Sequence, residues 1–246
     1  MATHFRDANL KLVRAEKHIF DLKFAITILK QTCTSTVEKH PETGIQELKH
    51  IVPNYEDAIS ELALIVGDAI HNLHTALDFA WHSTISIHAP RAISKSTKFP
   101  VRNSRPELKA ALEGIKVDRD IPALFKVILD EFKAYAGGND FLWTLHDLDI
   151  SDKHIFLLEF SPQATVSEIT VEDENGNVVT GSSMLIQTNP PYSFGFNPKW
   201  KLKNYGKLSL EVAFKEAGIF KGVQVLEMLR IFSIVASNIV HRLEKL

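Results

Sequence analysis

One stretch limits the possible folds of this chain more than any other: residues 66–82, with the sequence VGDAIHNLHTALDFAWH. Its apolar residues recur at helical spacing, so it predicts part of a long helix over residues 55–87. With about 100° between neighbours, five titratable residues share one broad face of this helix; they are Asp68, His71, His74, Asp78 and His82. Burying such a face without partners is costly. We therefore expect a central helix whose polar face borders a functional cavity, the alternative being a purely structural role for each residue.

The spacing within this face indicates two kinds of chemistry. His71 and His74 are three residues apart, and His74 and Asp78 are four apart, so their side chains meet on a helix. His71, His74 and Asp78 are thus candidate ligands of a divalent transition metal, which would activate water. Without a metal, an imidazole beside a carboxylate can act as a general base. Both interpretations stay open on the sequence alone.

A second concentration of titratable residues lies at 145–154, LHDLDISDKH, which we expect to form an acidic turn after a helix over 140–148. Asp152 or His154 is predicted to complete the site on the central helix, so the candidate catalytic residues are His71, Asp78, Asp152 and His154. The alternative is a solvated turn with a helix cap.

Three further residues are candidates for binding and positioning: Asp68, Asn72 and Lys153. Asn72 points about 100° away from His71, so we expect it to bond a neighbouring helix or the acidic turn. Lys153 is expected to pair with Asp68 or Asp78 as a structural clamp.

The two stretches, together with the KFP at residues 98–100, resemble a group of uncharacterised bacterial proteins with a G-D-x-x-H-N-L-R-x-A-L-D-H helix, an F-P and a later D-K-H. The matching positions are Gly67, Asp68, His71, Asn72, Asp78, Asp152, Lys153 and His154. The group's Arg-x4-His spacing is similar to that of the helical HEPN nucleases, but His74 and Phe79 occupy those two positions here. The resemblance implies no activity by itself. Gly67 costs about 1 kcal/mol relative to Ala inside a helix, which is usually tolerated for close packing or ligand approach.

The remaining pattern predicts an α+β fold: a mostly helical bundle with an antiparallel β-sheet inserted before a long C-terminal helix. We expect one domain over 1–246, with a helical part at 1–150, a β segment at 154–215 and a last helix at 220–246. That last helix is expected to pack on the bundle or to form a homodimer interface. The expected bundle helices cover 5–37, 55–87, 106–113, 121–136 and 140–148. Residues 40–44 are predicted as a connection, 86–105 as a long surface loop of the kind that forms lids, and 189–200 as a loop with aromatic side chains.

Composition narrows the function classes. The net charge of −2 gives no indication of a nucleic-acid or anionic-membrane partner, although a local basic patch is compatible with it. A single cysteine argues against a disulfide-built secreted scaffold, and neither a signal peptide nor a membrane span is evident. We expect a cytoplasmic protein. Phosphate-binding glycine loops, H-E-x-x-H, C-x-x-C and G-x-S-x-G are all absent from the sequence.

Three functional hypotheses follow. The first is an enzyme with the His/Asp site, with metal-assisted hydrolysis of a small substrate as one form of it. The second is a HEPN-like ribonuclease or an inactive relative in a defence or toxin role, which would work as a dimer and ignore chelators. The third is a non-catalytic protein that binds a small ligand in the helical cavity.

Overall fold

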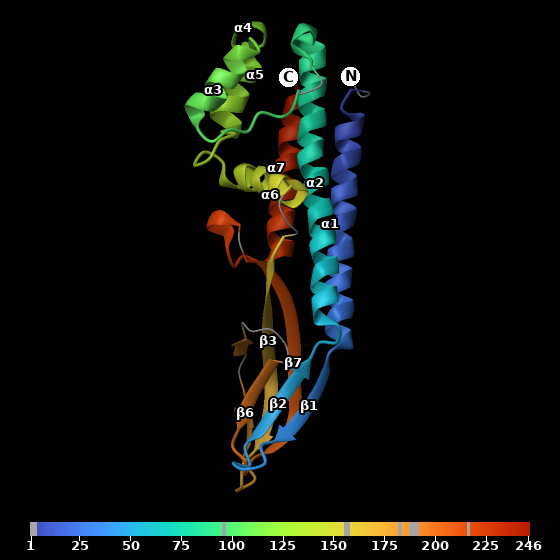
Figure 1. The fold of residues 1–246 in the computed structure, drawn as a ribbon, viewed down its shortest axis with the longest axis vertical. Coiled ribbons are helices and arrows are strands. Elements are labelled where there is room, and N and C mark those ends of the chain that lie inside the picture. Colours follow the sequence, from blue (N-terminus) through green and yellow to red (C-terminus); the bar gives the residue numbers. More distant parts are fainter. Residues whose placement is uncertain (1–3, 95–96, 155–157, 182–183, 187–191, 216) are drawn as a thin grey trace.

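Three long helices run side by side at one end of an elongated molecule, and the strands extend from the other end (Figure 1). These helices are α1 (Arg6–Thr32), α2 (Tyr55–His88) and α7 (Val225–Glu244). The computed structural model describes the chain except for residues 1–3, 95–96, 155–157, 182–183, 187–191 and 216. The side chains of Lys153, His154, Ser161, Pro162, Phe194 and residues 184–186 also lie outside the described part.

Helix α1 ends at Thr32, five residues before the expected end, so the prediction of a helix to residue 37 is wrong. The next residues form a hairpin of β1 (Thr34–Lys39) and β2 (Gln46–Ile51). Thr34, Thr36 and Val37 are β-branched and favour a strand over a helix. Within the turn, the His40 N–H donates to the Ile45 carbonyl at 2.8 Å. The predicted connection at 40–44 is therefore the turn of a hairpin.

Helix α2 lies between α1 and α7 and forms the centre of the bundle (Figure 1). Its apolar residues at 62, 66, 69, 70, 73, 76, 77 and 80 are all buried, as helical periodicity predicts. Glu56 and Asp57 occupy the first turn, where acidic side chains stabilise the positive end of a helix. Helix α7 packs against α2, α1 and α6, so the structure shows the first of the two alternatives for the last helix.

The middle of the chain forms short elements that lie beside the bundle or cross it (Figure 1). They are η1 (Pro90–Ala92), α3 (Arg105–Gly114), α4 (Val117–Asp120), α5 (Pro122–Lys126), the π-helix η2 (Val127–Phe132) and α6 (Asp140–His154). Between η1 and α3, Phe99 and Val101 are buried, so that part of the expected surface loop is anchored in the core. Asn139 accepts a hydrogen bond from the Leu142 N–H at 3.1 Å and so caps the start of α6. Helix α6 continues to His154, and the expected acidic turn is instead its last two turns.

The strands form two antiparallel sheets rather than one. A four-stranded sheet contains β3 (Phe160–Glu172), β4 (Val178–Thr180), β5 (Met184–Ile186) and β7 (Lys201–Phe214). The Asn175-Gly176 signal is confirmed as the turn between β3 and β4, with Gly176 at φ +82°. The other sheet has the order β1-β2-β6, and β6 (Tyr192–Phe196) lies where only a loop was predicted.

The α+β class is confirmed. Strands β3 to β7 lie between α6 and α7, as predicted, and β1 and β2 form the hairpin that joins α1 to α2. A last short helix, η3 (Gly218–Phe220), leads into α7. Nowhere in the described part of the chain is a helix both long enough and apolar enough to cross a membrane.

Candidate functional site in the seam between α2 and α6

The candidate site lies where α6 crosses α2. Every third residue along this part of α6 contacts α2, and the contacted residues of α2 are three or four positions apart. The residue numbers rise along one helix as they fall along the other. Asp152 lies against Gly67, Asp149 against His71 and His74, and His146 against His74. Figure 1 shows α6 lying across the long helices of the bundle. This matched spacing places polar side chains from both helices in one seam, and we call it the α2/α6 seam.

The first pair in the seam is His71 and Asp149. The His71 Nδ1 atom lies 3.1 Å from Asp149 Oδ1 within a hydrogen bond, and because a carboxylate oxygen accepts, Nδ1 is the donor. The His71 side chain is 43% exposed, whereas that of Asp149 is 3% exposed. The second ring nitrogen, Nε2, has the Thr75 hydroxyl 3.4 Å away. A buried carboxylate thus orients an imidazole that is itself partly exposed to solvent.

The second imidazole in the seam is His74, which is buried. Its Nδ1 lies 3.3 Å from the other Asp149 oxygen, Oδ2, and 3.8 Å from Asp78 Oδ2. Its Nε2 is 2.9 Å from His146 Nδ1, and the two rings are 5.1 Å apart at their centroids. Asp149 therefore faces two imidazoles, one through each oxygen, and both ring nitrogens of His74 face protein groups.

Gly67 is required by the close approach of α6. A Cβ atom at this position would lie 2.5 Å and 2.6 Å from the two carboxylate oxygens of Asp152, well inside van der Waals contact. Of the two reasons predicted for a glycine here, close packing or close approach of a ligand, the structure shows close packing. Asp152 is thus placed one helical turn from His71, on the same side of α2.

Asp78 contacts the backbone of the KFP segment, and the catalytic and metal-ligand roles predicted for it stay predictions. Its Oδ1 accepts a hydrogen bond from the Phe99 N–H at 2.8 Å, which ties the KFP segment to α2. The buried Phe99 ring then packs edge-on against Trp81, with ring centroids 6.1 Å apart. Two parts of the family-like pattern, the Asp of the helix and the F-P, are therefore joined by a structural contact.

The other candidates on α2 have their described contacts outside the seam. Asn72 accepts a hydrogen bond from Lys11 Nζ at 3.1 Å, so it bonds a neighbouring helix, as its angle from His71 predicts. Asp68 is exposed and acts on His18 of α1: burial lowers the pKa of His18, and the Asp68 charge opposes this effect. His82 is exposed, with the Ser86 hydroxyl 3.4 Å from its Nδ1.

Sequence reasoning missed two members of the seam, His146 and Asp149. The signal was present: His146, Asp149 and Asp152 recur every three residues, as one face of a helix requires. It was obscured because the helix was expected to end at residue 148. The catalytic role predicted for His154 and the clamp predicted for Lys153 lie on side chains outside the described part of the chain.

Comparisons with known proteins bear on identity. The chain matches no protein-family model, no curated protein and no solved structure. Any functional statement therefore depends on the geometry of the seam.

His71, His74 and Asp78 are the predicted ligands of a divalent metal. No group of three His, Cys, Asp or Glu side chains among the described residues is arranged to hold a metal ion. His74 faces Asp149 and His146, and Asp78 binds the Phe99 backbone. The metal site stays a prediction.

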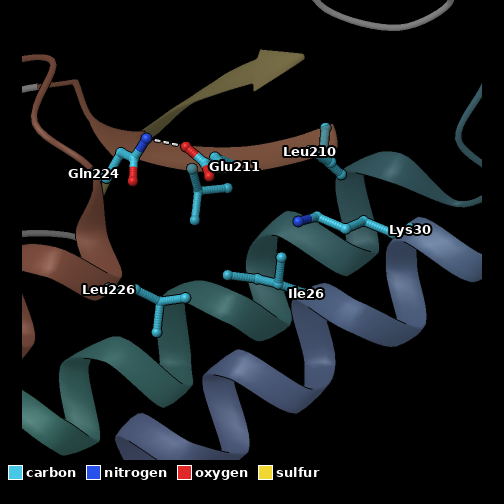
Figure 2. A pocket seen from close by; sticks show the side chains of 7 residues that line it. Ile26, Lys30, Leu210, Glu211, Gln224 and Leu226 are labelled. Carbon is cyan, nitrogen blue, oxygen red and sulfur yellow. Dashed lines mark hydrogen bonds between the residues drawn. The ribbon is translucent and has the colours of Figure 1, made fainter. Parts of the chain in front are cut away.

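One small cavity lies away from the seam, where β7 and the start of α7 meet α1 (Figure 2). Its volume is about 60 Å³, room for about two water molecules. Lys30 and Glu211 line it, and Glu211 accepts a hydrogen bond from Gln224. This cavity is too small for a substrate.

Proposed function

We propose that this protein is an enzyme in which His71 is a general acid–base catalyst oriented by Asp149, acting in the hydrolysis of a small substrate. The observation that carries the proposal is the 3.1 Å hydrogen bond between a 43%-exposed imidazole and a 3%-exposed carboxylate. A catalytic base must be held in place and must also reach the substrate. Among the histidines of the seam, His71 meets both requirements.

The proposed reaction uses the Nε2 atom of His71. Because Asp149 accepts the proton on Nδ1, Nε2 carries the lone pair and can take a proton from a water molecule. The water oxygen then attacks the electrophilic carbon or phosphorus of the substrate, and the bond to the leaving group breaks. The protonated imidazole, stabilised by Asp149, passes its proton to the leaving group and returns to its starting state.

The rest of the seam supports His71 by positioning Asp149. His74 lies 3.3 Å from the second Asp149 oxygen and is itself held by His146. The contact of Asp152 with Gly67 sets how closely α6 approaches α2. His74, His146 and Asp152 are thus positioning residues, because they act through Asp149 or through the helix that carries it.

The experiment compares His71→Gln and Asp149→Asn with wild type on p-nitrophenyl acetate, bis-p-nitrophenyl phosphate and a single-stranded RNA. Removing a general base lowers kcat/KM by about 10²- to 10⁴-fold. His82→Gln is the matched control, because His82 is an exposed histidine on the same helix. Hydrolysis of either chromogenic substrate that depends on His71 and Asp149 but not His82 supports the proposal. Cleavage of RNA alone favours the ribonuclease hypothesis, and turnover unaffected by His71→Gln overturns the proposed role.

The metal-assisted form of the proposal has a separate test. Elemental analysis of untagged protein compares wild type with His71→Ala and with the His71→Ala, Asp78→Ala double variant. Near-stoichiometric transition metal in wild type and its loss in both variants would support a metal centre. Metal-free protein after attempted reconstitution would leave only the acid–base form.

A further inference from the structure

Helix α1 has a second apolar face that points away from the bundle. Five large apolar side chains on it are 43–67% exposed: Leu10, Val13, Phe20, Phe24 and Ile28. They recur at spacings of three, four and seven residues, so they lie along one side of the helix. Figure 1 shows α1 at the edge of the bundle, beside α2. We call these five residues the α1 outer face.

The inner face of α1 is already fully used. Ala8, Leu12, Ala15, Ile19 and Leu22 are buried, as are Ile26 and Leu29 one and two turns further on. The outer face is therefore additional apolar surface, which the bundle does not need. It spans about 27 Å at 1.5 Å per residue. With roughly 150–200 Å² for each large side chain, its exposed area is roughly 500 Å², the size of the largest apolar patch on a typical monomer, which is often functional.

We propose that the α1 outer face binds the same face of a second copy of this chain, with the two helices antiparallel. The pattern is self-complementary about a twofold axis between residues 18 and 19. Val13 would then lie opposite Phe24 of the second copy, and Lys17 opposite Phe20, where an ammonium over an aromatic ring is favourable. Leu10 would lie opposite residues 27 and 28. Every apolar side chain of the face thus meets an apolar or cation–π partner.

Charges beside the face favour the same arrangement. Arg14 and Asp21 flank it on one side, and Glu16 and Lys23 flank it on the other. In the antiparallel pair, Arg14 lies close to Asp21 of the second copy, and Glu16 lies close to Lys23. Lys17 lies on the face itself, so a parallel pair would place it beside Lys17 of the second copy, which is repulsive. The position of Lys17 therefore favours the antiparallel dimer over the parallel one.

A groove beside the α1 outer face would add area to the same interface. A space of about 300 Å³ between α1 and α2 is lined by Leu10, Arg14, Asn72 and Phe79, among others. Phe79 is 39% exposed on α2 and extends the apolar surface past Leu10. The added area brings each copy closer to the roughly 800 Å² that a standard interface buries per partner. Within the described residues of α7, by contrast, Ile234 is the one exposed large apolar side chain.

The first test is sedimentation equilibrium of the full chain over low to high micromolar concentrations. Wild type is expected to show the mass of two copies, and the Phe20→Glu, Phe24→Glu double variant that of one. Both residues are more than half exposed, so circular dichroism and Tm should show a folded monomer. Ile234→Glu is the matched control, because it changes an exposed apolar residue on another helix. Monomeric wild type, or a dimer that the double variant leaves intact, would overturn the proposal and assign the face to a different partner.

A charge exchange tests the orientation. Arg14→Glu is expected to weaken the dimer about tenfold, because two symmetry-related ion pairs become repulsive. Adding Asp21→Arg should restore most of the affinity by recreating both pairs with reversed sign. A dimer that the second change weakens further would contradict the antiparallel arrangement. None of these residues lies in the α2/α6 seam, so the outcome is independent of the proposed catalytic function.

Discussion

Two histidines of this protein each have a polar partner, in very different settings. His71, in the α2/α6 seam, bonds a buried carboxylate and is 43% exposed. His50, on β2, has the Ser35 hydroxyl 2.7 Å from its Nδ1 and is 1% exposed. Burial lowers the pKa of His50, which favours its neutral form. The comparison shows that a bonded histidine is a candidate catalyst only when one edge of its ring can reach a substrate.

The largest expected effect separates the two histidines by function. His71→Gln should lower kcat/KM by about 10²- to 10⁴-fold and leave the free energy of unfolding nearly unchanged. His50→Gln should leave turnover intact and lower the free energy of unfolding by about 1 kcal/mol, because it disturbs a buried polar contact. Steady-state kinetics and urea unfolding of both variants measure the difference. Equal effects of the two substitutions on kcat/KM would contradict a catalytic role that is specific to His71.

The next effect concerns Asp149, because the partner of His71 is a carboxylate whereas the partner of His50 is a hydroxyl. Asp149→Ala should lower the free energy of unfolding by about 2–3 kcal/mol, since two imidazoles lose the same charged partner. Asp147→Ala is the matched control on the same helix: Asp147 is exposed, and its loss should change stability by less than about 0.5 kcal/mol. Urea unfolding of the two variants measures both values. A similar stability for both would mean that Asp149 does not hold the seam together.

A smaller effect is expected from the glycine under α6. Gly67→Ala should lower the free energy of unfolding by about 1–2 kcal/mol, because its methyl group overlaps the Asp152 carboxylate. At Gly114, in the last turn of α3, a Cβ meets nothing within 4 Å, so Gly114→Ala should be neutral or stabilising. In an Asp152→Ala background, Gly67→Ala should lose most of its cost. Persistence of the full cost there would show that Asp152 is not the obstacle.

The smallest expected effect is a pH dependence set by the buried histidines. Burial lowers the pKa of His50 and of His18 in the folded state, so the unfolded chain binds more protons just below the ordinary value of about 6.5. The free energy of unfolding should be at its maximum above about pH 6.5 and fall as the pH decreases through the lowered pKa values. Urea midpoints across this range measure the slope. His50→Gln should flatten it, and an unchanged slope in that variant would exclude His50 as a source.

The fold was largely predictable where apolar residues recur at helical spacing over many residues. Helices α1, α2 and α7 each have an apolar face long enough to specify the element, although α1 ends earlier than predicted. The hairpin of β1 and β2 was missed because its strands contain few apolar residues and are stabilised by pairing with the distant β6. Such nonlocal pairing leaves little signal in the strand itself.

The site was predictable in part for the same reason. His71 and the region around Asp152 were identified, because each lies in a visible cluster of titratable residues. Asp149 was missed because it lies beyond the predicted end of α6 at residue 148, and His146 was missed because its place in the site shows only when Asp149 and Asp152 continue the same helix. Asp78 has a local partner, the Phe99 backbone, that no side-chain pattern could reveal.

Gly67 has a consequence for how the two helices align. The seam places residues at similar intervals on both helices, so sliding α6 by one turn, about 5.4 Å, would again bring polar groups face to face. Only one position on the contacted side of α2 lacks a Cβ where Asp152 must fit. The absence of a Cβ at Gly67 thus allows only one alignment of the two helices, and it determines which carboxylate of α6 lies beside His71.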